Sequence, residues 1–263
     1  MKVLKHCAMY VFLVIASIVS IFPIYYALCL ASGGNVDLQV GPMLPGLKLL
    51  ENISYILFET KFKEPFLYTL GYCLMQTVLT MFVCVLAGYG FEIYHDNRKD
   101  SFFNVILWVY MIPFASLVVP TFIIFSDVSM VNTTAAIILP FIASPLIIMI
   151  FRQQSRDFPK EVMEAARLDG VREPFLFLYI YLPNMKSTLA CGIVISFLNA
   201  WNSYQWPRII MTHETKIPMM VYLTHMGHGD NMTLVLMSMF PSMIVFFFFQ
   251  KYFVQGMGCT VER

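Results

Sequence analysis

The sequence is a succession of long apolar stretches separated by short polar segments. A helix needs about 20 apolar residues to cross the roughly 30 Å hydrocarbon core of a bilayer. Six stretches approach that length, and five of the six contain no Asp, Glu, Lys or Arg. They are residues 7–31, 65–91, 101–126, 128–151, 187–211 and 231–250. The pattern predicts an all-α, polytopic membrane protein with six transmembrane helices in a single domain.

The apolar stretches differ in how they begin, end and bend. The first follows Lys2 and Lys5, as in a signal peptide, but it is longer than the roughly 7–15 residues of a signal-peptide core. We therefore expect a retained signal-anchor helix. The third and fourth are separated only by Asp127 and the polar residues 132–134, which predicts a tight re-entry. Prolines predict kinks in the central crossings at Pro113, Pro120, Pro140 and Pro145.

Two connecting segments are long enough to carry structure of their own. Residues 32–64 begin with a loop rich in Gly and Pro, followed by a mixed apolar and charged stretch, Leu47–Lys63. This stretch predicts an amphipathic surface helix. Residues 152–186 join the fourth and fifth crossings and hold the most specific pattern in the chain.

The composition agrees with a membrane protein. Hydrophobic residues make up 59% of the chain and charged residues 13%, whereas a soluble domain carries about 25% charged residues. A formal net charge of +1 gives no reason to expect a nucleic-acid partner. The six cysteines contain no CxxC pair and five of them lie in apolar stretches. We therefore expect buried free thiols and no disulfide framework.

The distribution of Lys and Arg predicts the orientation. Cytoplasmic segments of membrane proteins carry an excess of these residues. With the N-terminus in the cytoplasm, twelve of the 17 Lys and Arg residues fall in cytoplasmic segments, six of them in residues 152–186. We therefore expect a multi-pass protein of the plasma membrane with both termini in the cytoplasm.

The connector between the fourth and fifth crossings first predicts a short helix with one apolar face. Asp157 is a suitable N-cap for this helix, with Pro159 in its first turn. Ala165 and Ala166 are small enough to let a partner surface approach the backbone closely. Gly170 is the expected stop, because Gly adopts a left-handed conformation without strain.

A second short helix follows in the same connector. Pro174 suits its first turn, and we expect the helix to run from Phe175 to Leu182 and to end at Pro183. Together the two helices predict a rigid elbow with one face exposed to the cytoplasm.

The elbow resembles the EAA loop of ABC importer membrane subunits. The pattern E-A-A-x-x-x-G, nine residues, I-x-L-P is matched at Glu164, Ala165, Ala166, Gly170, Ile180, Leu182 and Pro183. The resemblance implies that these residues, with Asp169, couple the chain to a separate cytoplasmic ABC ATPase dimer. It also implies a second permease subunit and an extracellular solute-binding protein. ATP and Mg would be bound by the ATPase, and no cofactor by this chain.

Further short motifs resemble the carbohydrate importers of this family, in particular the maltose-type inner-membrane subunit. They follow the same order along the chain, at residues 111–113, 119–120, 132–133, 139–140, 151–152, 159–161, 201–202 and 252–256. The resemblance implies import of a sugar or oligosaccharide, and a heterodimer of two related permeases. Residues 256–263 depart from the Gly/Ala/Val/Lys-rich tail of the family, which argues against a contact between the tail and the ATPase.

Other classes of function have little support in the sequence. No G-x-x-x-x-G-K-[ST] motif is present, so an ATP-driven role requires a partner. Ion-coupled carriers need ionisable groups inside the membrane, and the crossings contain almost none. His225 and His228 lie close together, but an outer loop explains them better than a metal site does. No catalytic constellation is visible, so we expect a transport subunit and not an enzyme.

A neutral, hydroxyl-rich solute needs hydrogen-bonding partners and aromatic faces along its path. The outer half of the fifth crossing offers such side chains at Ser196, Asn199, Trp201, Asn202 and Tyr204. They predict either a substrate path or an interfacial belt with helix–helix contacts. A non-sugar solute such as glycerol phosphate is the first alternative cargo. A channel or carrier acting alone is the alternative from another class.

Overall fold

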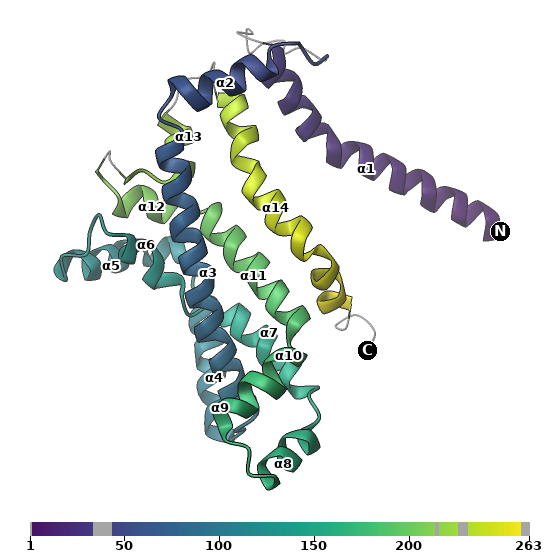
Figure 1. The fold of residues 1–263 in the computed structure, drawn as a ribbon, viewed down its shortest axis with the longest axis vertical. Coiled ribbons are helices and arrows are strands. Elements are labelled where there is room, and N and C mark those ends of the chain that lie inside the picture. The colour runs from purple at the N-terminus through teal and green to yellow at the C-terminus, as the bar shows by residue number, and fades with distance from the viewer. Residues whose placement is uncertain (1, 34–43, 214–215, 226–230, 259–263) are drawn as a thin grey trace. The chain divides into compact units, whose positions relative to one another are not determined.

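The computed structural model describes residues 2–33, 44–213, 216–225 and 231–258. These residues form α-helices with short 3-10 and π-helical segments, and they contain no strand (Figure 1). The all-α prediction is therefore confirmed. The chain divides into two compact units, one of Met1–Phe66 and Val221–Phe240, the other of Leu67–Met220 and Pro241–Arg263. The predicted tail after Gly258 lies outside the described residues, as does His228.

The first unit is built around the end of its first helix. It contains α1 (Lys2–Gly33), α2 (Leu49–Glu59) and parts of α13 (Met219–His225) and α14 (Asn231–Gly258). The last carbonyls of a helix lack partners within the helix. Here Asn52 Nδ2 donates to the carbonyl of Ala31 at 2.7 Å, and the Lys48 N–H donates to that of Ser32 at 3.2 Å. These bonds hold α2, which is the predicted surface helix shortened at both ends, against the end of α1.

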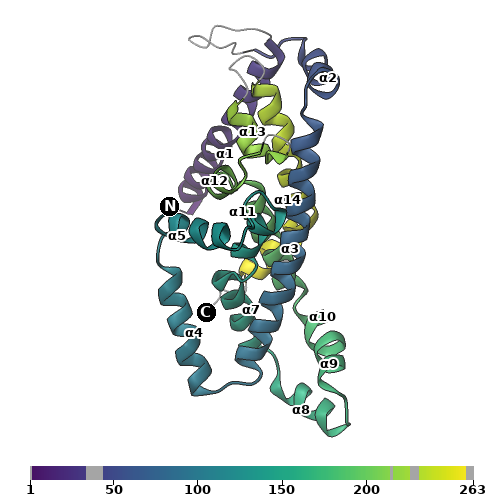
Figure 2. The same cartoon turned by 90° about the vertical axis from the view of Figure 1, so that its left-hand side faces the viewer.

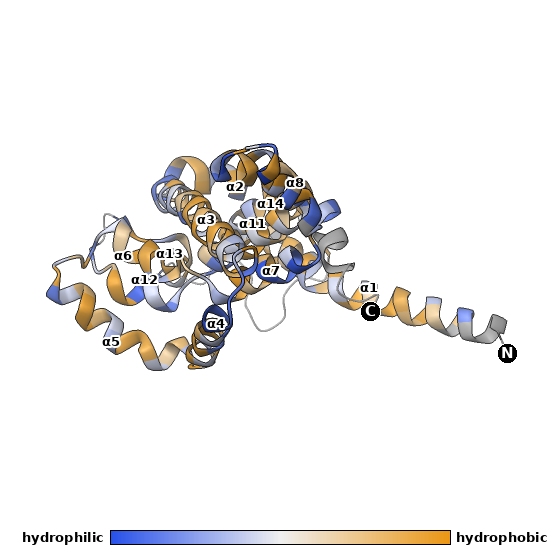
Figure 3. Cartoon of the chain, turned by 90° about the horizontal axis from the view of Figure 1, so that it is seen from below, coloured by the Kyte–Doolittle hydropathy of each residue, from blue (hydrophilic) through white to orange (hydrophobic). Residues whose placement is uncertain are grey.

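Helix α1 has the character of a membrane span. Hydrophobic residues run along most of its length (Figure 3). None of the residues in its most apolar window is buried within the structure. A helix that is apolar on all sides is typical of a segment surrounded by lipid or by other spans. The predicted first crossing, residues 7–31, lies within this helix.

The second unit contains most of the remaining helices. They are α3 (Lys63–Glu92), α4 (Asn97–Tyr110), α5 (Phe114–Asp127), α6 (Thr134–Ile138), η1 (Leu139–Phe141), α7 (Pro145–Arg156), α8 (Lys160–Leu168), α9 (Glu173–Phe175), η2 (Leu176–Tyr181), α10 (Leu182–Asn184), α11 (Lys186–Trp201) and α12 (Gln205–Ile210). Among the described residues, three helices are long and apolar enough to cross a membrane, and three bent helix pairs bring the total to six if each pair is one span.

The predicted third crossing, residues 101–126, is two helices in the structure. Helices α4 and α5 meet at 98° (Figure 2). Pro113 lies at the break, at the N-cap of α5 with ψ 131°. Proline has no N–H to continue a helix, and it disfavours the helical conformation of the residue before it. Pro120, by contrast, lies inside α5 and does not end it.

The predicted fourth and fifth crossings also have different limits. The fourth starts at α6, where Thr133 Oγ1 accepts a hydrogen bond from the Ala136 N–H at 3.2 Å, and it continues through a 43° bend to the end of α7. The fifth, predicted to reach residue 211, ends with α11 at Trp201. A new helix, α12, follows because Pro207 lacks an N–H and is tolerated only near the start of a helix.

Asn132 fixes the turn between α5 and α6. Its φ of 64° lies in the left-handed region, which Asn tolerates better than most residues. The Asn132 Oδ1 atom accepts hydrogen bonds from the backbone N–H groups of Thr212 at 2.6 Å and His213 at 3.1 Å. The turn is thereby joined to the segment that follows α12.

The core of the second unit lies where α3, α7 and the connector between α7 and α11 pack together. Its buried members are Met81, Cys84, Val85, Tyr89, Phe103, Ile147, Ile148, Phe151, Phe158, Met163, Ala166, Leu176, Tyr181 and Met185. Gly88 allows the close approach of α3 to α7, because a Cβ atom there would lie 2.5 Å from Phe151 Cβ.

We expect Gly88→Ala to destabilise the protein by about 1–3 kcal/mol, because the added methyl overpacks the α3–α7 contact. Gly90→Ala is the matched control in the same helix, since a Cβ atom there meets nothing within 4 Å. That control should be neutral or slightly stabilising. The midpoint of thermal unfolding in detergent measures both, and equal midpoints for the two variants would contradict the expectation.

Candidate functional site

The elbow begins with α8 and turns at Gly170. The Gly170 N–H donates to the carbonyl of Arg167, and the Val171 N–H donates to that of Ala166, both at 3.0 Å. This is the Schellman arrangement, which places a left-handed residue directly after a helix. Gly170 has φ +77°, so the predicted helix stop at this residue is confirmed.

One other local expectation for the elbow is wrong, and a second is off by one residue. Pro159 occupies the N-cap position of α8, and Asp157 is the C-cap residue of α7. The second helix, predicted to end at Pro183, runs from Glu173 to Asn184 and ends one residue beyond the proline, where the chain bends by 81° into α11. The π-helical segment η2 directly precedes Leu182 and Pro183, with the Leu182 N–H bonded to the carbonyl of Phe177. A π-turn shifts the hydrogen-bond register, which lets the helix pass a residue that cannot donate.

One face of the elbow packs into the chain's own core. Met163 and Ala166 on α8 are buried, as are Leu176 and Tyr181 on the second helix. The Tyr181 hydroxyl and Ser155 Oγ on α7 are hydrogen-bonded at 2.6 Å. Ala166 therefore faces inward, although the sequence suggested that both alanines would face a partner.

A polar bridge ties the two arms of the elbow to α3. Arg167 Nε on α8 donates to Glu173 Oε1 at 2.8 Å, and the Tyr89 hydroxyl on α3 donates to Glu173 Oε2 at 3.0 Å. The hydrogen bond with Glu173 raises the pKa of Arg167 above its usual value. The guanidinium also lies 5.5 Å from the centre of the Tyr94 ring. The bend at Gly170 is thus braced from both sides.

The other face of the elbow is exposed and partly apolar. Glu164, Ala165, Asp169 and Gly170 of the predicted coupling set lie on this exposed part, and so does Pro183. Ile180 and Leu182 are partly buried against the core. The exposed apolar side chains of the elbow include Val162, Leu168, Val171, Phe175, Leu178 and Tyr179, and Leu168 has an exposed fraction of 89%.

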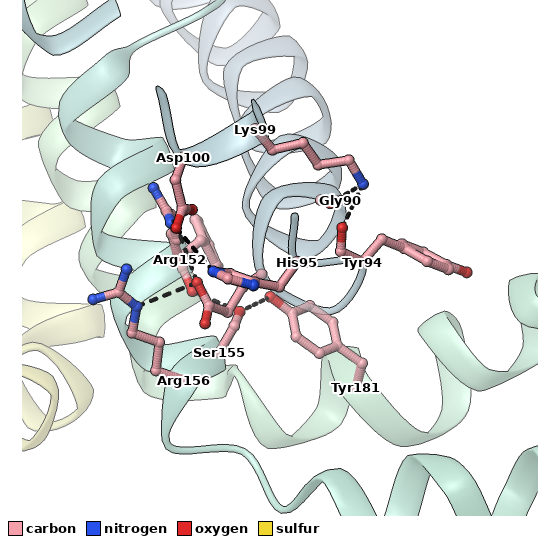
Figure 4. A network of polar contacts seen from close by, with 11 residues as sticks. Gly90, Tyr94, His95, Lys99, Asp100, Arg152, Ser155, Arg156 and Tyr181 are labelled. Atoms are coloured by element: carbon pink, nitrogen blue, oxygen red, sulfur yellow. Dashed lines mark hydrogen bonds and ion pairs between the residues drawn. The ribbon is translucent and has the colours of Figure 1, made fainter. Parts of the chain in front are cut away.

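A buried ion-pair network lies next to the elbow, at the end of α7 (Figure 4). Arg152 has only 7% of its side chain exposed. Its Nε donates to Glu92 Oε2 at the end of α3 at 3.2 Å, and its Nη2 donates to Asp100 Oδ1 near the start of α4. The guanidinium also lies over the ring of Phe103, 4.8 Å from its centre. A single cation therefore joins three helices.

Two further residues extend the network. Arg156 Nε also donates to Glu92 Oε2 at 3.2 Å, but this side chain is 58% exposed. His95 Nε2 and Asp100 Oδ2 lie 2.8 Å apart. A charge buried without partners is very costly, so each ion in the interior needs its counter-ion.

Sequence reasoning missed this network. Glu92 and Asp100 lie at the ends of apolar stretches, where charged residues are ordinary. The one available signal was Arg152 directly after an apolar stretch, which calls for an acidic partner if the side chain is buried. Which of the 16 acidic residues supplies it does not follow from the sequence.

A cavity of about 750 Å³ lies within the second unit. Its lining is mostly apolar and aromatic, and contains Val105, Ile106, Val109, Tyr110, Met111, Ile112, Pro113, Phe114, Leu117, Ile137, Pro140, Phe141, Ala143, Pro145 and Ile147. The polar residues of the lining come chiefly from α3 and α11; they are Gln76, Thr80, Ser144, Ser196, Asn199 and Ser203. A mostly apolar cavity with a few polar groups is the usual form of a small-molecule site.

The structure separates the predicted substrate-path residues. Ser196 and Asn199 line the cavity, as their spacing on one face of α11 suggests, and Ser203, which follows the end of this helix, lines it too. Trp201 is fully buried and stacks on Phe197, with 5.9 Å between ring centres. Asn202 and Tyr204 are exposed and are not among the lining residues.

Comparison with known proteins establishes the class of this protein. Residues 82–258 match the family described as "Binding-protein-dependent transport system inner membrane component". The match covers more than half of the chain, and the chain belongs to this family of transport permease subunits.

The chain is similar to several characterised permeases over nearly its full length. It is 36% identical over 259 residues to the lactose transport system permease protein LacG of Rhizobium radiobacter, covering 96% of this chain and 95% of LacG. It is 29% identical to the arabinooligosaccharides transport system permease protein AraQ of Bacillus subtilis, covering 95% and 93%. It is 28% identical to the sn-glycerol-3-phosphate transport system permease protein UgpE of Pectobacterium atrosepticum, covering 94% of each chain.

The fold also resembles that of a solved structure. A chain of a bacterial ABC transporter involved in the import of the acidic polysaccharide alginate superposes with a TM-score of 0.82. The superposition covers 95% of this chain and 96% of the other, at 20% sequence identity. The arrangement of helices described above is therefore the fold of an ABC importer permease.

We expect Arg152→Met to lower the free energy of unfolding by about 3–5 kcal/mol, because it leaves Glu92 and Asp100 without their buried counter-ion. Arg156→Met is the matched control. It removes a donor to the same Glu92 oxygen from an exposed position, where a pair is worth about 0–1 kcal/mol. Thermal unfolding in detergent compares the two, and an equal loss for both variants would show that burial of Arg152 has no energetic role.

Proposed function

We propose that this chain is one permease subunit of an ATP-driven importer for a sugar or oligosaccharide. A separate ATPase dimer docks on the elbow, and a second permease, a paralogue of this one, completes the path. An extracellular binding protein delivers the sugar. The observation that carries the proposal is the braced elbow, which holds the E-A-A-x-x-x-G pattern around a left-handed Gly170.

The exposed face of the elbow is suited to docking. Leu168 is 89% exposed and lies one turn after the exposed Glu164 and Ala165 on α8, and Tyr179 on the second arm is 72% exposed. Contiguous exposed apolar side chains mark interaction sites, because leaving them in water is unfavourable. Glu164, Ala165 and Asp169 are the residues that would touch the ATPase.

The remaining residues of the pattern would act by holding the elbow in shape. Ala166, Ile180 and Leu182 pack toward the core, and Gly170 provides the bend. Pro183 follows the π-helical segment through which the second arm leads into α11. A rigid arm transmits force better than a mobile one, so a braced elbow favours a mechanical role.

The proposed orientation places the elbow and both termini in the cytoplasm of a plasma-membrane protein. The excess of Lys and Arg in the predicted cytoplasmic segments supports it. ATP and Mg bind the partner ATPase in this arrangement, and this chain holds no cofactor.

Transport would follow by alternating access. ATP closes the ATPase dimer, the elbow moves with it, and the helices change from an inward-facing to an outward-facing arrangement. The outward-facing arrangement is favoured because ATP binds the closed ATPase dimer more tightly than the open one. A ligand shifts an equilibrium only by its differential affinity for the two states. Arg152 would carry the movement from the elbow to α3 and α4, because it joins these helices to α7.

A neutral sugar fits the cavity better than a charged solute does. The lining residues include no Asp, Glu, Lys, Arg or His, whereas phosphate and carboxylate groups are usually bound by Arg or Lys. The names of LacG and AraQ point the same way, and that of UgpE keeps glycerol 3-phosphate as the competing cargo.

Reconstitution tests the proposal directly. The chain, tagged and purified with the proteins that accompany it, is placed in liposomes with ATP inside and with lactose, arabinotriose or glycerol 3-phosphate outside. We expect uptake of a sugar at least tenfold above the no-ATP level, and no uptake by this chain alone. Flux through the isolated chain would favour a channel or carrier, and uptake restricted to glycerol 3-phosphate would contradict a sugar cargo.

Replacements of Gly170 test the role of the elbow. We expect Gly170→Val to strain the bend by about 1–3 kcal/mol, because a β-branched residue is unfavourable at φ +77°. The complex should then hydrolyse ATP while uptake falls at least tenfold. Gly170→Asn is the matched control, since Asn tolerates the left-handed region, and it should retain most of the uptake. Normal uptake by an assembled Gly170→Val complex would contradict a coupling role.

A further inference from the structure

Helix α2 is held where long apolar helices begin and end. Asn52 Nδ2 donates to the carbonyl of Ala31 at 2.7 Å, and Thr233 Oγ1 near the start of α14 donates to the same carbonyl at 3.5 Å (Figure 1). Helix α3 begins at Lys63, just after α2 ends at Glu59. Of the helices in the described ranges, α1, α3 and α14 are the three that are long and apolar enough to cross a membrane by themselves. Helix α2 therefore lies where membrane spans reach the membrane surface.

Two rows of side chains on α2 are accounted for within the protein and by water. Residues on one side of a helix recur every three or four positions. The inner row contains Ile56, which is buried, and Asn52, which makes the bond to α1. The polar row contains Glu51, Tyr55 and Glu59 at four-residue spacing, and all three are exposed. The helix thus has one side for the protein and one for water.

A third row on α2 is apolar and exposed. It contains Leu50, Ser54 and Phe58, again at four-residue spacing, with Leu50 79% and Phe58 76% exposed. Leu47, directly before the helix, is also fully exposed. The Ser54 hydroxyl donates to the carbonyl of Glu51 at 2.8 Å, so its hydrogen does not need water as a partner. Large apolar side chains gathered on one face of a protein mark an interaction surface.

Lipid is the occupant that suits this apolar row. Ile53 and Leu57 lie between the inner row and the apolar row, so the charged residues are confined to the opposite side of the helix. A helix of this kind lies in the membrane plane, with its apolar side at the boundary of headgroups and acyl chains. The most apolar window of α1, to which α2 is bonded, is likewise unburied by protein. A soluble partner that binds and leaves would return the apolar row to water, whereas lipid covers it permanently.

Lysines beside the apolar row fit the boundary between lipid and water. Lys63 Nζ lies 5.0 Å from the centre of the Phe58 ring. Lys48 and Lys61 flank the two ends of α2, and both are exposed. A lysine at a membrane surface lays its apolar stem along apolar groups and directs its ammonium toward the headgroups. Each end of α2 therefore carries a cation that can reach lipid phosphates.

We propose that α2 is a membrane-surface anchor. Its apolar row, with Leu47 beside it, inserts into the boundary between the headgroups and acyl chains of a phospholipid bilayer, and the polar row stays in water. Because α2 is bonded to the end of α1, the anchor fixes the depth of that end in the membrane. The inference does not depend on the cargo, since it rests on contacts within the first unit of the chain.

Depth measurements test the anchor in the complete transporter complex in phospholipid liposomes. The fluorophore NBD is attached at Leu50→Cys or Phe58→Cys, in a chain whose Cys7 and Cys259 are replaced by serine; the remaining cysteines are buried. We expect spin-labelled lipids to quench both labels about threefold more strongly than a label at Glu51→Cys, the matched control from the polar row. Iodide in the aqueous phase should show the opposite order.

A double variant separates anchoring by the apolar row from tethering by α1. The label is placed at Ser54→Cys, and Leu50→Glu and Phe58→Glu are added together. We expect lipid quenching of the label to fall about threefold, because two carboxylates do not enter the apolar boundary. The midpoint of thermal unfolding should stay the same, since both replaced side chains are exposed.

Three results would overturn the anchor. Equal lipid quenching at Leu50→Cys, Phe58→Cys and Glu51→Cys, with free access of iodide, places the whole helix in water. Protection of the first two labels from both quenchers assigns the apolar row to another protein of the complex. An unchanged Ser54→Cys signal in the double variant shows that the bonds to α1 set the position of α2. None of these results changes the proposed function, which is decided by the uptake experiment.

Discussion

The packing of α3, α4 and α7 beside the elbow depends on the ion pairs of the buried Arg152 guanidinium. It lies where three helices meet, with Glu92 at the end of α3, Asp100 near the start of α4, and its own position on α7. In a chain with so few charges, an ion in the interior is stable only if its counter-ions are held in place. The elbow begins a few residues beyond Arg152, so its position follows from this junction. The bridge from Arg167 through Glu173 to Tyr89 fixes the elbow a second time, again to α3.

The elbow and the cavity are linked by the same helices. Helix α3 carries Gln76 and Thr80 at the cavity and Tyr89 and Glu92 at the junction. Helix α7, only 12 residues long, lines the cavity with Ile147 and ends at the ion pairs. In the proposed mechanism, a displacement of the elbow reaches the cavity through these packed helices. Close packing of the kind seen at Gly88 and Phe151 transmits movement because it leaves no room to absorb it.

The differences between prediction and structure have a common cause. Apolar composition predicts that a segment is helical and buried in lipid or protein, but it says little about where that helix bends or in which direction it then runs. Pro113 divides one apolar stretch into helices at 98°, whereas Pro120 lies inside a continuous helix. Pro183 lies one residue before the end of its helix, where the chain bends by 81° into α11. Whether a proline breaks a helix depends on the partners available to the freed carbonyl, and those partners come from the surroundings.

The sequence by itself determined the properties that depend on neighbouring residues. Long uncharged stretches require helices, because backbone groups in an apolar environment must be satisfied within the segment. The stop at Gly170 depends only on local backbone geometry. The pairing of Arg152 with Glu92 and Asp100, the place of Gln76 in the cavity lining and the inward position of Ala166 were decided by the tertiary structure. Each of these features involves side chains on different helices. The burial of such a side chain, and the groups it pairs with, are set only when those helices pack.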